Sequence, residues 1–136
     1  MKIFVDANVL IDLIDEKREF HSQAISFFQN NLENVFYTSC DILTTVYYIT
    51  SKIKNPLLDL ENLLKFVKII SFSNEEAQKA IELMKNNSNF KDFEDTLQYI
   101  LAKKINADLI VTNDKKFHSP DIEILNLNTS PKSQPS

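Results

Sequence analysis

The chain contains no glycine among its 136 residues. The P-loop, the dinucleotide-binding GxGxxG turn and the GxSxG nucleophile elbow all need backbone conformations that only glycine adopts readily. The sequence therefore excludes these three routes to phosphate binding or nucleophile activation. Asparagine has to supply most left-handed turn positions, because its short polar side chain tolerates them best after glycine.

The composition is that of one globular domain, with 43% hydrophobic and 25% charged residues. The lone cysteine, Cys40, cannot form an intrachain disulfide or a cysteine metal cluster. No signal peptide and no apolar run near the ~20 residues of a membrane span is present, so we expect a cytoplasmic protein without a membrane segment. The net charge of −4 argues against nonspecific nucleic-acid binding, although acids gathered around a metal could offset a basic rim.

Strand-like apolar runs alternate with segments of helical spacing along the chain. Strands separated by helices predict an α/β fold, with a parallel sheet covered by helices on both faces. One domain is expected over residues 1–127, followed by a disordered polar tail at 128–136. Strands are expected at 3–5, 35–37, 68–72, 108–112 and, at an edge, 122–125, and helices at about 20–28, 39–51, 56–67, 73–84 and 93–104.

Helical spacing also predicts which side chains face the core. Tyr47 and Phe93 are expected to be buried, and Asn106 is expected to end the last helix in the left-handed conformation. One further apolar stripe is predicted, made of Leu57, Leu60, Leu64 and Val67.

Four aspartates occur where a parallel sheet would place a functional site. Asp6 directly follows the first strand, and Asp114 follows the strand at 108–112 after one intervening residue. Asp92 and Asp95 are three residues apart near the start of a helix, so they share a face. Sites in such sheets lie at the carboxyl ends of the strands. If the two strands are neighbours, all four carboxylates can converge.

A cluster of carboxylates suits metal-assisted hydrolysis of a phosphodiester. Mg²⁺ and Mn²⁺ take oxygen ligands in near-octahedral geometry, and acids packed together repel one another unless a cation neutralises them. One or two such ions can activate water and stabilise charge on a phosphoryl oxygen. This chemistry needs no glycine loop, cysteine or histidine, so the sequence contains what it requires.

Each aspartate also has an ordinary structural explanation. Asp6 and Asp92 could cap the helices that follow them, with Asp95 at the third position of its helix. Asp114 could be a turn residue. Capping and metal binding are compatible, because helix N-termini attract acids in any case. Their joint placement after strand ends is what favours a site.

Three segments of the chain resemble PIN domains, a family of metal-dependent ribonucleases. The family's opening is similar to FVDANVLIDLID, its middle to YTSCDILTTVYYITSK and its second half to KDFEDTLQYILAKKINADLIVTNDKKF. The resemblance spans residues 2–127 and implies a Rossmann-like parallel sheet, a Mg²⁺ or Mn²⁺ site, and RNA cleavage that leaves a 5′-phosphate and a 3′-hydroxyl. Small bacterial members are often VapC-type toxins, which implies an antitoxin partner and a homodimer.

The resemblance also implies roles for individual residues. Asp6, Asp95 and Asp114 match the catalytic, metal-binding acids of the family, and Asp92 matches an extra metal-binding acid found in some members. The polar positions that support the metal ligands correspond to Asn8 and Thr112.

Two positions depart from the family pattern. Thr45 stands where the family commonly has a glutamate in the middle helix. Asp41, four residues earlier on the same face, could partly substitute for it, or could instead form a capping box with Thr38. Lys116 stands where an acid often precedes the closing phenylalanine, here Phe117. These departures imply weaker metal binding or a loss of activity.

Several side chains near these acids could contact RNA. Tyr48 lies near the helix face that carries Asp41, and its ring could stack on a base. Lys52, Lys115 and Lys116 could contact phosphates, although solvated surface is the ordinary role of a lysine. Residues after Phe20 carry aromatic side chains that could seat a partner helix.

The leading hypothesis is a Mg²⁺- or Mn²⁺-dependent endoribonuclease, the toxin of a type II toxin–antitoxin pair. A degenerate PIN fold that binds RNA or protein without cutting is the alternative, motivated by Thr45 and Lys116. A receiver domain would need an acidic pair after the first strand and an acceptor aspartate in mid-chain. The chain has Asp6 and Asn8 at the first place and Ser73 near the second, so this third hypothesis ranks below the others.

Overall fold

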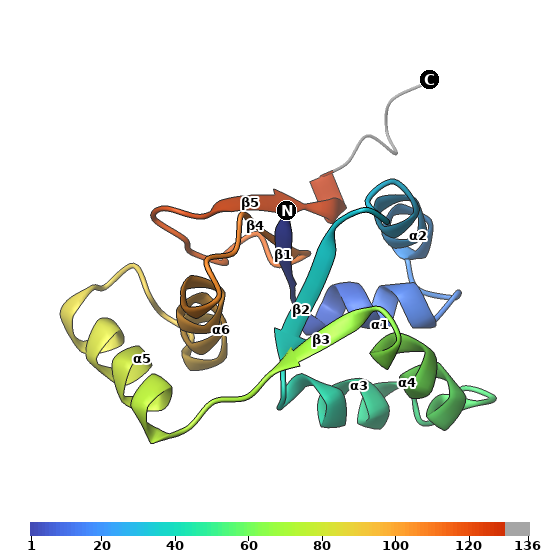
Figure 1. Ribbon diagram of the computed structural model, residues 1–136, viewed down its shortest axis with the longest axis horizontal. Helices are drawn as coiled ribbons and strands as arrows, with labels where there is room; N and C mark the ends of the chain where they lie inside the picture. The colour runs from blue at the N-terminus through green and yellow to red at the C-terminus, as the bar shows by residue number, and fades with distance from the viewer. Residues whose placement is uncertain (130–136) are drawn as a thin grey trace.

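The computed structural model describes residues 1–129 as a parallel five-stranded sheet with helices on both faces (Figure 1). This is the α/β architecture that the alternating pattern predicted. The strands are β1 (Lys2–Val5), β2 (Val35–Ser39), β3 (Val67–Ile70), β4 (Leu109–Thr112) and β5 (Glu123–Asn126). The helices are α1 (Ala7–Ile14), α2 (His21–Gln29), α3 (Ile42–Thr50), α4 (Pro56–Leu64), α5 (Asn74–Asn86) and α6 (Phe93–Lys104), followed by a 3-10 helix, η1 (Leu127–Thr129).

The strand order β3-β2-β1-β4-β5 puts β1 at the centre of the sheet and β5 at an edge, as predicted. Phe4 of β1 lies opposite Tyr37 of β2, and Val5 of β1 lies opposite Val111 of β4. The chain first builds the sheet on one side of β1 and then returns to the other side. The order therefore reverses between β1 and β4, where open α/β sheets form their ligand crevice.

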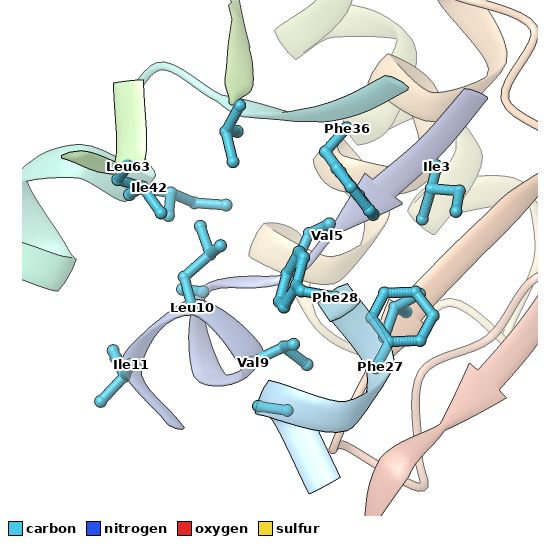
Figure 2. Close-up of a cluster of buried hydrophobic side chains, with 14 of the residues drawn as sticks. Ile3, Val5, Val9, Leu10, Ile11, Phe27, Phe28, Phe36, Ile42 and Leu63 are labelled. Atoms are coloured by element: carbon cyan, nitrogen blue, oxygen red, sulfur yellow. The ribbon is translucent and has the colours of Figure 1, made fainter. Parts of the chain in front are cut away.

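Alternate residues of β1 face opposite layers of helices, as strand geometry requires. Ile3 and Val5 belong to a cluster that includes side chains of α1, α2, α3 and α4 (Figure 2). Phe4 belongs to a second cluster on the other face, together with Leu97 and Leu101 of α6. Both layers are thus anchored on the strand that ends at Asp6.

The buried face of α4 differs from the predicted stripe. Leu63 is buried and Leu60 partly so, while Leu57 and Leu64 are exposed. The helix ends at Leu64, so the chain turns before Val67 and that residue enters the core from β3 instead. Only the Leu60–Leu63 side of α4 reaches α3 and β3 as a result.

Two aromatic side chains predicted in the core are exposed instead. Helix α3 packs through Ile42 and Val46, and Tyr47 projects about 100° away from Val46 around the helix. Phe93 has the helical phase of Leu97 but lies one turn nearer the start of α6, beyond the hydrophobic cluster.

Asn106 has φ of 56° and is the only residue with positive φ within residues 1–129, which confirms the predicted left-handed helix end. The predicted tail began too early, because Asn128 lies in η1 and its side-chain amide donates a hydrogen bond to the carbonyl of Asn113. The rest of that tail, residues 130–136, lies outside the described part of the chain. No helix within residues 1–129 is long and apolar enough to cross a membrane.

Candidate metal centre

Strands β1 and β4 pair directly, so the acids that follow them lie at the same edge of the sheet. Thr112, the last residue of β4, joins the two. Its hydroxyl donates to Asp6 Oδ2 over 2.8 Å and accepts from the backbone N–H of Asp114 over 3.0 Å. Convergence of these acids required the two strands to be neighbours, and they are.

Asp6 is buried and held by several donors. Its Oδ1 accepts from the backbone N–H of Ala7 over 2.6 Å, and its Oδ2 also accepts from the side-chain amide of Asn8 over 3.3 Å. Asp6 is thus the N-cap of α1, which agrees with its ordinary structural explanation. Burial raises the pKa of Asp6, and the nearby charge of Asp114 raises it further, while the bond from Thr112 opposes the shift.

Asp92 and Asp95 lie at the start of α6. Asp92 is the N-cap, and its Oδ1 accepts from the backbone N–H of Asp95 over 2.9 Å. The pKa of Asp95 is raised to about 8, chiefly by burial, then by the charges of Asp6 and Asp92, and also by a side-chain hydrogen bond with Asp114. A pKa of about 8 means that Asp95 keeps its proton at neutral pH unless a cation compensates the cluster.

A cleft of about 280 Å³ brings the predicted acids together. We call it the acidic cleft. Its acids are Asp6, Asp92, Glu94, Asp95 and Asp114, and its other lining residues include Asn8, Arg18, Thr45 and Ile49. Acids that are far apart in the sequence therefore line one cleft, as expected.

Glu94 was not singled out by sequence reasoning, although it lies between two acids that were. Much of its side chain is exposed, but the carboxyl lines the acidic cleft. Its pKa is raised by partial burial and by the charges of Asp6, Asp41 and Asp92. Three acids within the first four residues of one helix segment were the available signal.

The residues expected to support the ligands have different surroundings. Asn8 and Thr112 both donate to Asp6, as described above. Thr45 lines the acidic cleft, whereas Asp41 accepts a hydrogen bond from the hydroxyl of Ser39 and does not line that cleft. The capping box with Thr38 is not formed, because the Thr38 hydroxyl is buried and donates to the carbonyl of Val5 over 2.8 Å.

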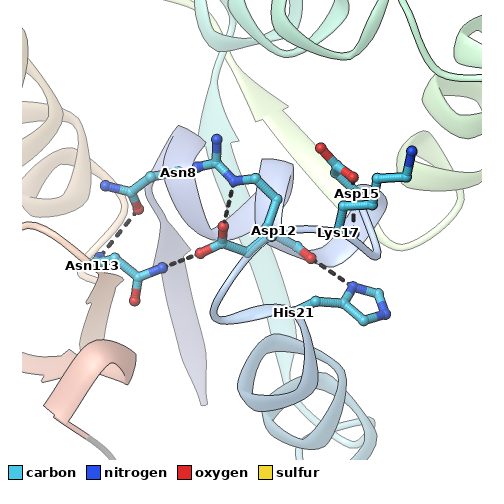
Figure 3. Close-up of polar contacts among 7 residues, drawn as sticks. Asn8, Asp12, Asp15, Lys17, His21 and Asn113 are labelled. Atoms are coloured by element: carbon cyan, nitrogen blue, oxygen red, sulfur yellow. Dashed lines mark hydrogen bonds and ion pairs between the residues drawn. The ribbon is translucent and has the colours of Figure 1, made fainter.

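A partly buried polar network around Asp12, which sequence reasoning missed, lies next to the acidic cleft (Figure 3). Asp12 accepts from Arg18 Nε over 2.9 Å and from the side-chain amide of Asn113. His21 Nδ1 donates to the carbonyl of Asp12 over 2.8 Å. The backbone N–H of Asn113 donates in turn to Asn8 Oδ1 over 3.1 Å. An aspartate inside the apolar run of α1, four residues after Asn8, was the available signal.

Gln98 is a second polar residue that sequence reasoning missed. It lies within α6, its relative exposure is only 2%, and neither amide atom has a hydrogen-bond partner of normal geometry in the described structure. Its amide is nevertheless close enough to Asp6 to lower the pKa of that carboxyl. We therefore place Gln98 beside Asp6 without a formed hydrogen bond.

Within residues 1–129, only Lys116 of the predicted RNA-contacting residues lines a pocket together with one of the acids. Lys116 lines an adjoining pocket of about 170 Å³ that also contains Lys91 and Asp114. Tyr48 is 80% exposed on α3. Lys52 and Lys115 are exposed and line neither hollow.

The chemistry of this donor set fits a hard divalent cation. Within residues 1–129, no three histidine, cysteine or acidic side chains are arranged so that they could hold a metal ion as they stand. Burial and the charges of Asp6 and Asp92 raise the pKa of Asp95, and Asp6 accepts from three protein donors. Carboxylates packed this closely repel one another unless a cation neutralises them, and oxygen-rich sites of this kind take Mg²⁺ or Mn²⁺.

Known proteins are similar to this chain in sequence. A family model described as PIN domain matches residues 3–123. Ribonuclease VapC1 of Aquifex aeolicus (strain VF5) is 50% identical over 128 residues, which cover 91% of this chain and 89% of that protein.

Solved structures with low sequence identity share the fold. VapBC2 from Rickettsia felis, bound to a DNA fragment from its promoter, matches with a TM-score of 0.68 and 22% identity over 93% of this chain and 98% of the other. A toxin–antitoxin complex from Klebsiella pneumoniae matches with a TM-score of 0.70 and 17% identity over 92% and 97%. With the family model and the relative at 50% identity, these findings establish that the chain belongs to the PIN-domain family.

Proposed function

We propose that this PIN-domain protein is a divalent-metal-dependent endoribonuclease that hydrolyses RNA phosphodiester bonds. The observation that carries the proposal is the acidic cleft, where Asp6, Asp95 and Asp114 meet at the carboxyl edge of the sheet. Its support from relatives is the 50% identity to a protein named Ribonuclease VapC1. Mg²⁺ or Mn²⁺ is the proposed ion.

Asp6, Asp92, Asp95 and Asp114 would hold the ion. A bound divalent cation supplies activation of water and neutralises charge that develops on the phosphate. Asp6 enters this chemistry in a fixed orientation, because three protein donors already hold its two oxygens. Asp95 brings a proton that must leave as the cation binds, since a carboxyl needs its charge to be a good ligand.

Thr45 motivates a second candidate function. It lines the acidic cleft at the position where the family commonly has a glutamate, and a hydroxyl is a weaker ligand than a carboxylate. Lys116 adds a positive charge beside Asp114 in the adjoining pocket. A degenerate module that binds RNA without cutting is the alternative that these two residues favour.

An antitoxin partner, a homodimer and a cytoplasmic location complete the proposal. A solved structure with the same fold is a toxin–antitoxin complex, and another is a VapBC assembly on promoter DNA. We propose by this likeness that a small antitoxin protein binds the chain and blocks the acidic cleft. Size-exclusion chromatography of the purified chain tests the dimer, and coexpression with a small antitoxin-like reading frame, if one adjoins the coding sequence, tests the partner.

Cleavage of single-stranded and structured RNA by the purified chain tests the main proposal. We expect cutting with Mg²⁺ or Mn²⁺, none with EDTA, and none in Asp6→Asn or Asp95→Asn. Glu61→Gln, an exposed carboxyl on α4, is the matched control and should cut as the wild type does. RNA binding without cutting by the wild type would instead establish the degenerate module, and cutting that persists in both aspartate variants would indicate a contaminating nuclease.

A further inference from the structure

The acidic cleft carries an electrostatic problem for the substrate proposed above. Five carboxyls line it, and Arg18 is the one cationic side chain among its lining residues within the described part of the chain. An RNA backbone carries one negative charge per phosphate, so it is repelled by this surface wherever no cation is present. A substrate phosphate therefore needs a positive group that is already at the cleft.

Arg18 is oriented by a buried partner. Its Nε donates to Asp12 Oδ1 over 2.9 Å, and only 3% of the Asp12 side chain is exposed. The second oxygen of Asp12 accepts from Asn113, whose backbone N–H donates to Asn8 (Figure 3). The side-chain amide of Asn8 in turn donates to Asp6. The guanidinium is thus connected to the first acid of the cleft by a continuous set of hydrogen bonds.

The outer part of the same guanidinium is unused. Its terminal Nη groups have no hydrogen-bond or ion-pair partner within residues 1–129, and 39% of the side chain is exposed. Because guanidinium is planar, a bond at Nε fixes the direction in which both Nη groups point. Two adjacent N–H donors in this geometry match the oxygens of a phosphate.

We infer that Arg18 binds a backbone phosphate of the RNA at the acidic cleft. This inference rests on the proposed ribonuclease function and extends it to how the substrate is held. Asp12 and Asn113 orient the arginine, and the phosphate takes the two free donors. Arg18 thereby holds the sugar–phosphate chain against the carboxyls that would otherwise repel it.

A purely structural role for Arg18 predicts something different. If Arg18 only neutralises the buried charge of Asp12, its loss lowers the stability of the fold and leaves RNA affinity unchanged. If Arg18 binds phosphate, its loss weakens RNA binding and makes that binding less dependent on salt, even when the fold is intact.

The test measures binding of a labelled single-stranded oligoribonucleotide by fluorescence anisotropy, once with Ca²⁺ and once with EDTA. We expect Arg18→Gln to raise the Kd about tenfold and to reduce the slope of log K against log salt by about 0.7, the value of one phosphate contact on a single strand. Arg18→Lys keeps the charge but loses the two adjacent N–H donors, so its Kd should lie between those of the wild type and Arg18→Gln. Lys17→Gln removes the neighbouring exposed cation, which does not line the cleft, and should bind as the wild type does.

The Tm of each variant is measured in parallel, and Arg18→Lys serves as the deciding variant if Arg18→Gln does not fold. An unchanged Kd and salt slope in a folded Arg18 variant would overturn the inference, as would an equal loss of affinity in Lys17→Gln. A wild-type chain that binds no RNA would overturn it as well. Arg18-dependent binding without any metal-dependent cutting would overturn the proposed function and support the phosphate role of Arg18.

Discussion

Two carboxyls at the same position of neighbouring helices have pKa values that are shifted in opposite directions. Glu76 is the third residue of α5, after the N-cap Ser73, and Asp95 is the third residue of α6, after the N-cap Asp92. The pKa of Glu76 is lowered to about 2, whereas the pKa of Asp95 is raised to about 8. Both acids lie at the positive end of a helix, so the helix dipole cannot explain the difference.

The difference comes from what surrounds each carboxyl. Glu76 accepts from the backbone N–H of Ser73 over 2.7 Å, and its other oxygen lies 3.3 Å from the Nζ of Lys104. Asp95 is partly buried among Asp6, Asp92 and Asp114. One carboxyl is thus held in its charged form by donors, and the other is disfavoured in its charged form by burial and by neighbouring acids. The same local pattern serves structure in one helix and proposed function in the other.

The largest effect is expected on RNA cleavage when Asp95, but not Glu76, is replaced by its amide. Asp95→Asn should reduce RNA cleavage by at least about 10³-fold, because a metal ligand worth several kcal/mol is lost. Its amide can still donate to Asp114 as the protonated acid does, so the fold should remain intact. Cleavage rates with Mg²⁺, together with urea unfolding, measure both quantities. Glu76→Gln is the matched control at the same helix position and should cut normally; a similar loss of cleavage in both variants would contradict the comparison.

The next effect is the pH dependence of stability without metal. The pKa of Asp95 is about 8 in the folded chain, above the ordinary aspartate value of 3.8, so the folded state binds more protons between these values. Stability should therefore fall as the pH rises from about 4 to about 8 in EDTA. Thermal unfolding at a series of pH values measures this, and Mg²⁺ or Asp95→Asn should flatten the dependence. A Tm that does not change over this window in EDTA would show that Asp95 is not held protonated.

Sequence reasoning found the fold and most of the acids for a clear physical reason. Strand and helix periodicity is local, and the rule that parallel sheets carry sites at their carboxyl ends selects Asp6 and Asp114 without knowledge of contacts. It could not establish that β1 and β4 are neighbours, because strand order depends on the whole chain. The structure supplies that order.

The residues that sequence reasoning missed owe their roles to contacts across the fold. Asp12 looks like an interruption of an apolar helix until Asn113, 101 positions later in the chain, is seen to donate to it. Gln98 looks like an ordinary polar helix residue, and only packing shows that it is buried. The prediction for Tyr47 was wrong in the opposite direction, because this side chain was expected to be buried and is exposed. Helical spacing alone does not say which of two adjacent faces of a helix packs against a neighbouring element.

A smaller effect is expected at Gln98, the buried amide of α6 that lies beside Asp6. Gln98→Met removes two buried polar atoms without partners, so the free energy of unfolding should rise by about 1–2 kcal/mol. It also removes an amide that lowers the pKa of Asp6, so about tenfold more Mg²⁺ should be needed for half-maximal cleavage. Urea unfolding and Mg²⁺ titration of cleavage measure the two changes.

Leu97→Met is the control for Gln98→Met, because it is a buried, volume-conserving change on the same helix. It should cost less than about 1.5 kcal/mol and leave the Mg²⁺ requirement unchanged. A Gln98→Met variant that is destabilised would show that the amide has partners in solution, and an unchanged Mg²⁺ requirement would show that it does not act on Asp6.

The smallest effect is expected on stability at Glu76, the carboxyl of the capping box of α5. The pKa of Glu76 is about 2 in the folded chain, below the ordinary glutamate value of 4.5, so the folded state binds fewer protons between these values. Its stabilising contribution should be complete above about pH 4.5 and should disappear as the pH falls toward 2. Glu76→Gln should therefore unfold at lower urea than the wild type at pH 7, and the two midpoints should converge near pH 2. Glu75→Gln, whose exposed ion pair with Lys79 contributes little, is the control, and a wild-type advantage that persists unchanged to pH 2 would show that the Glu76 charge is not what stabilises α5.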